Sequence, residues 1–408
     1  MSSHCRICKS PLSHTFVDLG VSPLANSYVP LDKEKRGEIF YPLHAYVCDQ
    51  CFLVQLEEFE NPDAIFSNYA YFSSYSAAWL RHADAYAGAM KARFGLGADS
   101  KVVEVASNDG YLLQYFLARG VPVLGVEPAA NVAKAAIANG VATRVLFFGA
   151  ETARRLLDEG EAADLMVANN VLAHVPDILD FVAGFRILLK SAGVATFEFP
   201  HLLRMIEQSQ FDTIYHEHFS YLRLGVVADL MQRRGLRVFD VEQLATHGGS
   251  LRVFVCHDAA HYPISPEVAH ILGLEEASRL NDLSGYAGFA DAAVTIKSDA
   301  LLFMINARRE GKLVCGYGAA AKGNTFLNYT GTGPDYIKVV ADRSPHKQGA
   351  LLPGSRIPVV SPDEMLALKP DYIFILPWNL REEISAELAA ARDWGCRFVV
   401  AVPTLSIF

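Results

Sequence analysis

Four cysteines in two closely spaced pairs constrain the fold of this chain more than any other feature of its sequence. The pairs are Cys5-x-x-Cys8 and Cys48-x-x-Cys51. Because only two residues separate the cysteines of a pair, one turn can present both thiolates to a single ion, and zinc takes four such ligands at tetrahedral angles. Free thiols or a redox pair are the alternative, but neither pair stands beside a thioredoxin-like strand and helix. We expect a structural zinc ion that folds a small N-terminal lobe, residues 1–65, and has no position open for chemistry.

Composition narrows the class of protein. The chain has 408 residues, of which 51% are hydrophobic, so it is long enough for two or three domains with substantial cores. Its 36 basic and 45 acidic residues give a net charge of −9, which disfavours a general nucleic-acid binder but leaves room for a local basic pocket. The residues up to Cys8 are polar and no apolar run reaches the length of a membrane span, so we expect no signal peptide, no membrane segment and a cytoplasmic protein.

Apolar segments of strand length alternate with helical stretches from residue 101 onward, which is typical of parallel, doubly wound sheets. The strands expected in a domain over residues 66–258 are 101–105, 121–126, 165–168 and 194–199, with 237–241 and 251–255 as a closing pair. Residues 259–310 read as a helical connector. The strands expected in a last domain, residues 311–408, are 313–317, 336–341, 372–376 and 397–402. The predicted fold class is therefore α/β, with a zinc-binding lobe followed by two Rossmann-like domains.

The turn after the first expected strand suits a cofactor without phosphate. A dinucleotide site would need G-x-G-x-x-G, but the segment from Val103 to Gly110 has one glycine. S-adenosylmethionine (SAM) carries an ammonium and a sulfonium, which the carboxylate of Glu104 or Asp109 can approach. Glu127 ends the next strand, where an acid can bind both ribose hydroxyls. An ordinary turn with surface acids is the alternative. The residues expected to bind SAM are Glu104, Ser107, Asn108, Gly110, Glu127, Asn169 and Asn170.

The segment Tyr215-His216-Glu217-His218 is the candidate for chemistry. Moving a methyl group to carbon requires removal of a proton beside a carbonyl, and a histidine has a pKa suited to that step. A carboxylate such as Glu217 can orient an imidazole, and the hydroxyls of Tyr71 and Tyr215 can stabilise an enolate oxygen. A metal site and polar capping of a loop are the alternatives.

Two further segments carry candidate site residues. His174 follows the end of an expected strand. The turn from His247 to Arg252 is either an ordinary hairpin or part of the wall of a substrate site, and the sequence favours neither.

A second glycine-containing turn runs from Gly316 to Thr325. Its backbone N–H groups suit an anion, and Lys322 adds positive charge. It is not a P-loop and resembles an NAD site only weakly, so a nucleotide diphosphate on the substrate accounts for it as well as a second cofactor does. A structural turn without a ligand is the alternative. The expected substrate-binding residues are His216, His247, Gly249, Arg252, Gly318, Lys322, Asn324 and Asp342.

Together these segments resemble the zinc-containing, SAM-dependent C-methyltransferases of deoxysugar biosynthesis, which act on carbon 3 of nucleotide-linked 4-keto-6-deoxyhexoses. The resemblance extends over nearly the whole chain and includes the Tyr/Ser-rich segment 69–76. It implies an N-terminal zinc lobe, a central class I SAM-methyltransferase domain and a C-terminal Rossmann-like domain that helps hold the nucleotide of the substrate. Ala106 stands where such methyltransferases usually have glycine.

The resemblance also implies roles for individual residues. His218 would be the base that removes the proton from carbon 3, and Glu217 would support it. The side chains that would line the sugar pocket are Tyr71, Tyr215 and His174. Tyr69 and Tyr75 remain alternatives to Tyr71. The resulting enolate would attack the methyl group of SAM.

Three functions are therefore open. The first is a SAM-dependent C-methyltransferase with structural zinc that acts on a nucleotide-linked keto sugar, with dTDP as the expected nucleotide. The second is a related methyltransferase that acts on carbon or oxygen of another nucleotide sugar or of a small carbonyl metabolite. The third is an NAD-dependent or non-catalytic protein, which the missing G-x-G-x-x-G disfavours.

Overall fold

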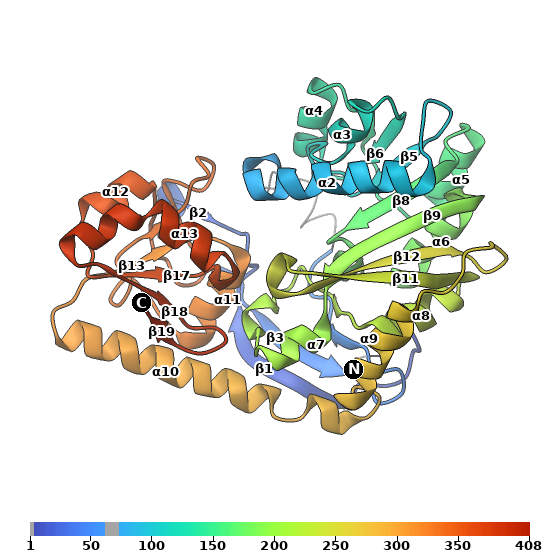
Figure 1. Ribbon diagram of the computed structural model, residues 1–408. Helices are drawn as coiled ribbons and strands as arrows, with labels where there is room; N and C mark the ends of the chain where they lie inside the picture. The colour runs from blue at the N-terminus through green and yellow to red at the C-terminus, as the bar shows by residue number, and fades with distance from the viewer. Residues whose placement is uncertain (1–3, 62–72) are drawn as a thin grey trace. The chain divides into compact units, whose positions relative to one another are not determined.

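The computed structural model describes residues 4–61 and 73–408, which form two compact units (Figure 1). The segments of the first unit are the residues up to Leu12, Cys48–Leu203 and Phe219–Gly285. Those of the second unit are Ser13–Val47, Arg204–His218 and Tyr286–Phe408. Each unit therefore combines pieces that are far apart in the sequence. Tyr69 and Tyr71 lie outside the described residues.

A seven-stranded sheet forms the centre of the first unit (Figure 1). Its strands, in spatial order, are β11 (Leu236–Leu244), β12 (Ser250–His257), β9 (Leu189–Pro200), β8 (Ala163–Asn169), β5 (Val102–Val105), β6 (Val123–Val126) and β7 (Thr143–Arg144). The strands from β9 to β7 run parallel, whereas β12 is antiparallel to both β9 and β11. The expected parallel sheet and its closing antiparallel pair are confirmed.

The order of these strands creates a place for a ligand. From β5 the chain moves outward through β6 and β7, and then returns to β8 on the other side of β5. The connections that leave the carboxyl ends of β5 and β8 therefore diverge, and in open α/β sheets this divergence is where ligands bind.

Helices cover the sheet of the first unit (Figure 1). They are α2 (Ala77–Phe94), α3 (Leu113–Leu117), α4 (Ala130–Ala138), α5 (Ala150–Asp158), α6 (Ile178–Leu188), α8 (Leu224–Gln232) and α9 (Pro266–Ala277). α2 begins where the hydroxyl of Ser76 accepts a hydrogen bond from the Trp79 N–H, and it ends at Gly95 in a left-handed conformation. Its buried Tyr86 hydroxyl lies 2.5 Å from Thr196 Oγ1 of β9, which fixes the helix against the sheet. A short antiparallel pair, β4 (Val54–Leu56) and β10 (Ser220–Tyr221), completes this unit.

A six-stranded sheet forms the centre of the second unit. Its strands, in spatial order, are β16 (Val359–Val360), β14 (Val340–Ala341), β13 (Val314–Tyr317), β17 (Tyr372–Ile375), β18 (Arg397–Val400) and β19 (Ser406–Ile407). All neighbours are parallel except β18 and β19. The expected strand 336–341 is confirmed only in its last two residues, β14. The carboxyl ends of β13 and β17 flank the switch point of this sheet.

The remaining elements of the second unit are helices and two antiparallel strand pairs. The helices are α10 (Phe289–Arg309), α11 (Ala321–Thr330), α12 (Pro362–Ala367) and α13 (Arg381–Glu387), and α7 (Leu202–Glu207) leads into this unit. The strand pairs are β1 (His14–Ser22) with β3 (Tyr41–Val47) and β2 (Val29–Pro30) with β15 (Ala350–Leu351). Phe303 of α10 packs against Tyr372 of β17, with ring centroids 5.1 Å apart. No helix among the described residues is both long and apolar enough to cross a membrane.

Replacing Gly110 by alanine should destabilise the first unit more than the same change at Gly140. Both glycines have a positive φ, +80° and +83°, so backbone strain contributes about 1–2 kcal/mol at each site. A Cβ at Gly110 would also lie 2.9 Å from Val141 Cγ2, whereas a Cβ at Gly140 would meet no atom within 4 Å. We expect urea unfolding to show an additional loss of about 1–3 kcal/mol for Gly110→Ala. Equal losses would contradict this close packing.

Candidate active site and metal centre

The four cysteines of the two pairs come together in the first unit. The four Sγ atoms all lie within 4.8 Å of one another. Cys5 Sγ is 3.5 Å from Cys51 Sγ, and Cys8 Sγ is 3.4 Å from Cys48 Sγ, so none of them forms a disulfide. Zn–S bonds of about 2.3 Å at tetrahedral angles place sulfurs about 3.8 Å apart. The cluster therefore has the donor set and the spacing that zinc requires.

Two equivalent turns present these thiols. The N–H of Lys9 donates to the carbonyl of Cys5, and the N–H of Phe52 donates to that of Cys48, both at 2.9 Å. Lys9 and Phe52 each follow a pair directly and have φ of 65° and 60°. Each pair thus closes one tight turn with a left-handed residue at its end, and four thiols converge because the same turn occurs twice.

Arg6 links this cluster to the rest of the first unit. Its guanidinium donates to the carbonyl of Leu56 at 2.6 Å and to that of Pro176 at 2.9 Å. Burial lowers the pKa of Arg6 to about 10, so the side chain stays charged at neutral pH. The turn that holds Cys5 and Cys8 therefore also fixes Pro176, two residues after His174.

The turn after β5 has an unusual backbone. Ala106 and Asn108 have φ of 57° and 50°, a region that residues other than glycine rarely adopt. Glu127, at the end of β6, holds the turn because its carboxylate accepts hydrogen bonds from Asn108 N at 2.9 Å and Ala129 N at 2.8 Å. Burial raises the pKa of Glu127. The Asn108 side-chain oxygen in turn accepts a hydrogen bond from Ser73 N at 2.9 Å, just before α2.

Several side-chain oxygen atoms at this edge of the sheet are buried and have no hydrogen-bond partner among the described residues. They include both carboxylate oxygens of Glu104 and the side-chain oxygens of Ser107, Asn169 and Asn170. Burial raises the pKa of Glu104 well above its usual range. Buried polar atoms are nearly always paired, because an unpaired one costs about 1–3 kcal/mol. A polar ligand that donates hydrogen bonds at the ends of β5 and β8 would satisfy these atoms, and SAM has such donors.

The histidine segment belongs to the second unit and follows the short helix Phe211–Thr213. His218 Nδ1 lies 2.9 Å from the carbonyl oxygen of Thr213. A carbonyl can only accept, so Nδ1 carries the proton, and in the neutral ring the basic lone pair is then on Nε2. The ring of Tyr215 covers that of His218, with centroids 3.9 Å apart. In this neutral tautomer, Nε2 is therefore the nitrogen of His218 that can accept a proton.

The other two members of the segment are buried. The amide of Asn26 donates to both carboxylate oxygens of Glu217, at 2.8 and 2.9 Å. Burial raises the pKa of Glu217 to about 7, although the Asn26 amide opposes this shift. His216 Nε2 lies 3.1 Å from the carbonyl of Pro42, and burial lowers its pKa. The imidazole of His218 is thus oriented by a backbone carbonyl, and Glu217 is paired with an amide.

A buried aspartate supports the beginning of this segment. Trp378 Nε1 donates to Asp212 Oδ2 at 2.8 Å. Burial raises the pKa of Asp212 to about 6, against the opposing charge of Lys322. The hydroxyl of Thr325 donates to the carbonyl of Ile214 at 2.9 Å. Helix α11 and the loop after β17 therefore both hold the loop that carries His218.

The other expected substrate residues fall into different surroundings. In the first unit, Arg252 is buried, and its guanidinium pairs with Glu198 and Glu242, each at 2.9 Å. His247 has a φ of 56°, and its ring meets that of Trp79 edge-on at 5.6 Å. His174 ends the short helix Leu172–His174, and Gly249 N donates to Thr246 O at 2.9 Å.

The turn after β13 lies at the switch point of the second sheet. Gly318 has a φ of 91°, and a Cβ there would lie 2.4 Å from Pro377 Cδ, so glycine is required. Lys322 Nζ lies 4.9 Å from the centre of the Trp378 ring, and Asn324 Nδ2 donates to the carbonyl of Ala25 at 2.6 Å. Asp342 Oδ1 accepts from Ser344 N at 2.9 Å. Lys322 and Asn324 of α11 and Asp342 after β14 therefore make structural contacts within the unit.

Sequence reasoning missed the residues that orient the histidine segment. Asn26, Thr213, Asp212 and Trp378 carry no motif, and they stand far from one another in the chain except for the neighbours 212 and 213. No signal in a single sequence identifies a backbone carbonyl as the partner of an imidazole. The sugar-pocket residue Tyr71 falls outside the described residues, and its alternative Tyr75 is 61% exposed.

Replacing Cys48 by serine should release the metal and loosen the first unit. Metal analysis of the wild type should find about one zinc per chain, because four thiolates fill one tetrahedral shell. We expect Cys48→Ser to lose most of this zinc and to unfold at a lower temperature. Cys256→Ser is the control, since Cys256 is equally buried in the same unit but outside the cluster. A zinc-free Cys48→Ser protein as stable as the wild type would exclude a structural metal.

Glu217 should make the protein less stable as the pH rises from about 5 to about 7. Folding raises the pKa of this carboxyl from 4.5 to about 7, so in that range the folded state keeps a proton that the unfolded state has lost. Glu217→Gln removes the titration, and its amide oxygen can still accept from Asn26. We expect its free energy of unfolding, relative to wild type, to increase by up to about 3 kcal/mol over this range. A constant difference in urea unfolding at pH 5, 6, 7 and 8 would contradict the raised pKa.

Three families of domains match consecutive parts of the chain. Residues 5–66 match a zinc binding domain, residues 79–241 a methyltransferase domain, and residues 245–403 a C-methyltransferase C-terminal domain.

Individual proteins resemble this chain over different shares of its length. The C-methyltransferase NovU of Streptomyces niveus is 35% identical over 399 residues, which is 98% of this chain and 95% of that protein. A ubiquinone biosynthesis O-methyltransferase of Rhodopseudomonas palustris (strain BisA53) is 26% identical over 97 residues, 24% of this chain and 38% of its own. The structure of magnesium protoporphyrin IX methyltransferase from Synechocystis PCC 6803 matches at 12% identity and a TM-score of 0.34, covering 44% of this chain and 79% of that one, which is too distant to support an argument.

The expected α/β architecture with its zinc-binding domain is confirmed, and so is the enzyme class, a SAM-dependent methyltransferase with SAM and zinc as cofactors. The relationship to NovU spans nearly the full length of both chains. The chain therefore belongs to the family of C-methyltransferases that includes NovU of Streptomyces niveus.

Proposed function

We propose that this enzyme transfers the methyl group of SAM to carbon 3 of a nucleotide-linked 4-keto-6-deoxysugar, with dTDP as the nucleotide. The full-length relationship to a C-methyltransferase supports carbon as the acceptor atom. The observation that carries the mechanism is the hydrogen bond from His218 Nδ1 to the carbonyl of Thr213, which places the basic lone pair on Nε2.

The acceptor carbon must first become a nucleophile. In a 4-keto sugar, the hydrogen on carbon 3 is acidic because the electrons of the broken C–H bond move into the neighbouring carbonyl. His218 Nε2 takes this proton, and an enolate forms with its charge on the oxygen at carbon 4. SAM, when bound, supplies an electrophilic methyl group whose leaving group is a neutral thioether. Carbon 3 of the enolate forms the new C–C bond, and the proton on His218 passes to solvent.

The surroundings of His218 suit this role. The Thr213 carbonyl holds the proton on Nδ1 and so prevents the ring from presenting the wrong tautomer. The ring of Tyr215 restricts rotation of the imidazole. We assign Tyr215, Tyr71 and His174 to the sugar pocket. There, hydrogen-bond donors would stabilise the negative charge that develops on the enolate oxygen. Glu217 is assigned to the support of this loop through its pairing with Asn26.

We assign SAM to the edge of the first sheet where β5, β6 and β8 end. Support comes from the buried side-chain oxygens that lack partners among described residues. The carboxylate of Glu127 would accept hydrogen bonds from the ribose hydroxyls, because the two hydrogen bonds from backbone N–H groups leave further lone pairs available. The other residues of this assignment are Glu104, Ser107, Asn108, Gly110, Asn169 and Asn170.

His218→Asn should abolish both methyl transfer and proton exchange at carbon 3. Asparagine can still donate to the Thr213 carbonyl through its amide, but it has no basic nitrogen. We expect the rate to fall about 10²–10⁴-fold, the usual contribution of a general base. Exchange should be followed by NMR, using dTDP-4-keto-6-deoxyglucose deuterated at carbon 3 with S-adenosylhomocysteine in place of SAM. Calorimetric titration with S-adenosylhomocysteine serves as the control, because binding of this ligand should be unchanged.

Methylated product that retains the deuterium would refute abstraction at carbon 3. Exchange that persists in His218→Asn would assign the base to another residue. Methylation of a carbonyl compound without a nucleotide, at a rate equal to that of the dTDP sugar, would favour the small-metabolite alternative.

A further inference from the structure

A small pocket with a basic lining lies in the second unit, apart from the residues assigned so far. It has a volume of about 180 Å³ and is lined by Tyr28, Val29, Pro30, Lys33, Arg36, Gly37, Glu38 and Arg356. Pockets for whole drug-sized ligands usually enclose about 300–1,000 Å³. The pocket therefore suits one compact charged group better than a complete nucleotide.

Among the described residues, a carboxylate pairs with one of the three cations that line this pocket. The guanidinium of Arg356 forms an ion pair with Glu38 and also donates to the carbonyls of Glu34 and Arg36, at 2.7 and 2.8 Å. These bonds fix the loop 34–38. The side chains of Lys33 and Arg36 are exposed and form no hydrogen bond or ion pair with any residue between 4 and 61 or from 73 onward.

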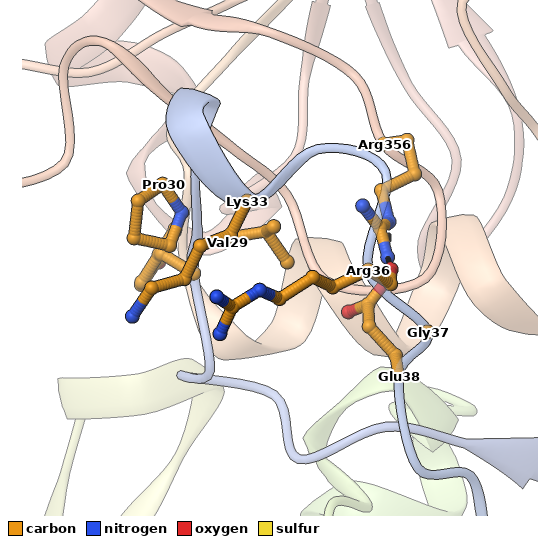
Figure 2. A pocket seen from close by; sticks show the side chains of 8 residues that line it. Val29, Pro30, Lys33, Arg36, Gly37, Glu38 and Arg356 are labelled. Atoms are coloured by element: carbon orange, nitrogen blue, oxygen red, sulfur yellow. Dashed lines mark hydrogen bonds and ion pairs between the residues drawn. The ribbon is translucent and has the colours of Figure 1, made fainter.

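Figure 2 shows the side chains of Lys33 and Arg36 extending to the same side of the pocket, beside Val29 and Pro30. The pocket therefore presents two positive charges from a short, anchored loop. In a chain with a net charge of −9, such a concentration of unneutralised cations favours an anionic ligand.

The turn after β13, where the sequence predicts anion binding, has its nearby cations paired. Lys347 Nζ donates to Ala319 O at 2.7 Å and lies 3.4 Å from Asp342 Oδ2. Arg343 forms an ion pair with Glu387. Lys322 is close to the buried carboxyl of Asp212. Positive charge for a phosphate is therefore more available at Lys33 and Arg36 than at this turn.

Tyr28 connects the pocket to the turn. Tyr28 is one of the residues that line the pocket, and its hydroxyl donates to the carbonyl of Ala319 at 2.5 Å. Lys347 Nζ lies 5.7 Å from the centre of the Tyr28 ring. A ligand at the turn and an anionic group in the pocket would thus contact neighbouring parts of one surface within this unit.

We propose that Lys33 and Arg36 form a subsite for a diphosphate group. Arg36 can donate two parallel hydrogen bonds to phosphate oxygens, and Lys33 adds a mobile point charge. The subsite deepens the proposed function, on which it rests for its natural ligand, the diphosphate of the nucleotide-linked sugar. Free diphosphate has the same chemistry and is the alternative source.

The test is calorimetric titration of the full-length protein with dTDP and, separately, with inorganic pyrophosphate. The double variant Lys33→Gln/Arg36→Gln should bind both at least about tenfold more weakly, because two charge-assisted contacts are lost. Lys35→Gln/Lys338→Gln removes the same charge from exposed lysines of the same unit outside the pocket, and should bind like the wild type. S-adenosylhomocysteine binding and the melting temperature should be the same in all three proteins.

Each outcome has a clear meaning. Weaker binding of both probes in the pocket variant alone, with a raised KM and an unchanged kcat for the dTDP sugar, supports the subsite with a nucleotide ligand. Pyrophosphate binding that depends on Lys33 and Arg36, without any dTDP binding, supports a diphosphate site but removes the nucleotide from the proposed function. Equal binding by the pocket variant and the wild type, an equal loss in both double variants, or no pyrophosphate binding by the wild type would overturn the proposal.

Discussion

The four-thiol cluster is the constraint on which much of the chain's organisation depends. Cys8 and Cys48 bound a segment, residues 13–47, that leaves the first unit, contributes to the second, and then returns. That segment carries Asn26, which pairs with Glu217, and Tyr28, which pairs with Ala319. A metal bound to both cysteine pairs would close the chain between them into a loop before the rest of the protein folds. This restriction would reduce the entropy cost of placing this segment. A structural zinc ion thus has a consequence for residues that never touch it.

The candidate active residues are held by buried polar contacts more than by exposed charges. His218 takes its orientation from a backbone carbonyl, Glu217 from an amide, and Asp212 from an indole N–H. Burial raises the pKa of both carboxyls toward neutrality, to about 7 and about 6. Buried hydrogen bonds of this kind fix the conformation of the loop that carries His218.

The histidine segment and the glycine-containing turn belong together in the structure, although more than a hundred residues separate them in the sequence. The hydroxyl of Thr325 and the indole of Trp378 both bind the loop from Phe211 to His218. Helix α11 and the loop after β17 therefore support the loop that carries the proposed base. A ligand would be expected at the switch point of the second Rossmann-like sheet. Lys322 and Asn324, which follow that point, instead contact the ring of Trp378 and the carbonyl of Ala25.

Features that depend on local spacing could be predicted from the amino-acid sequence alone. The two C-x-x-C pairs specify the metal ligands, because two intervening residues suit one turn. Alternating strands and helices specify the parallel sheets, because buried parallel strands are short and apolar on both faces. The strand 336–341 was overestimated: its register pairs with β13 and β16 involve Val340 and Ala341, although Lys338 N also donates to Val314 O of β13. Only the tertiary structure decided which partner each polar side chain has. Asn26 meets Glu217, and Thr213 meets His218 through its main chain, because packing brings together groups that no periodicity or motif connects.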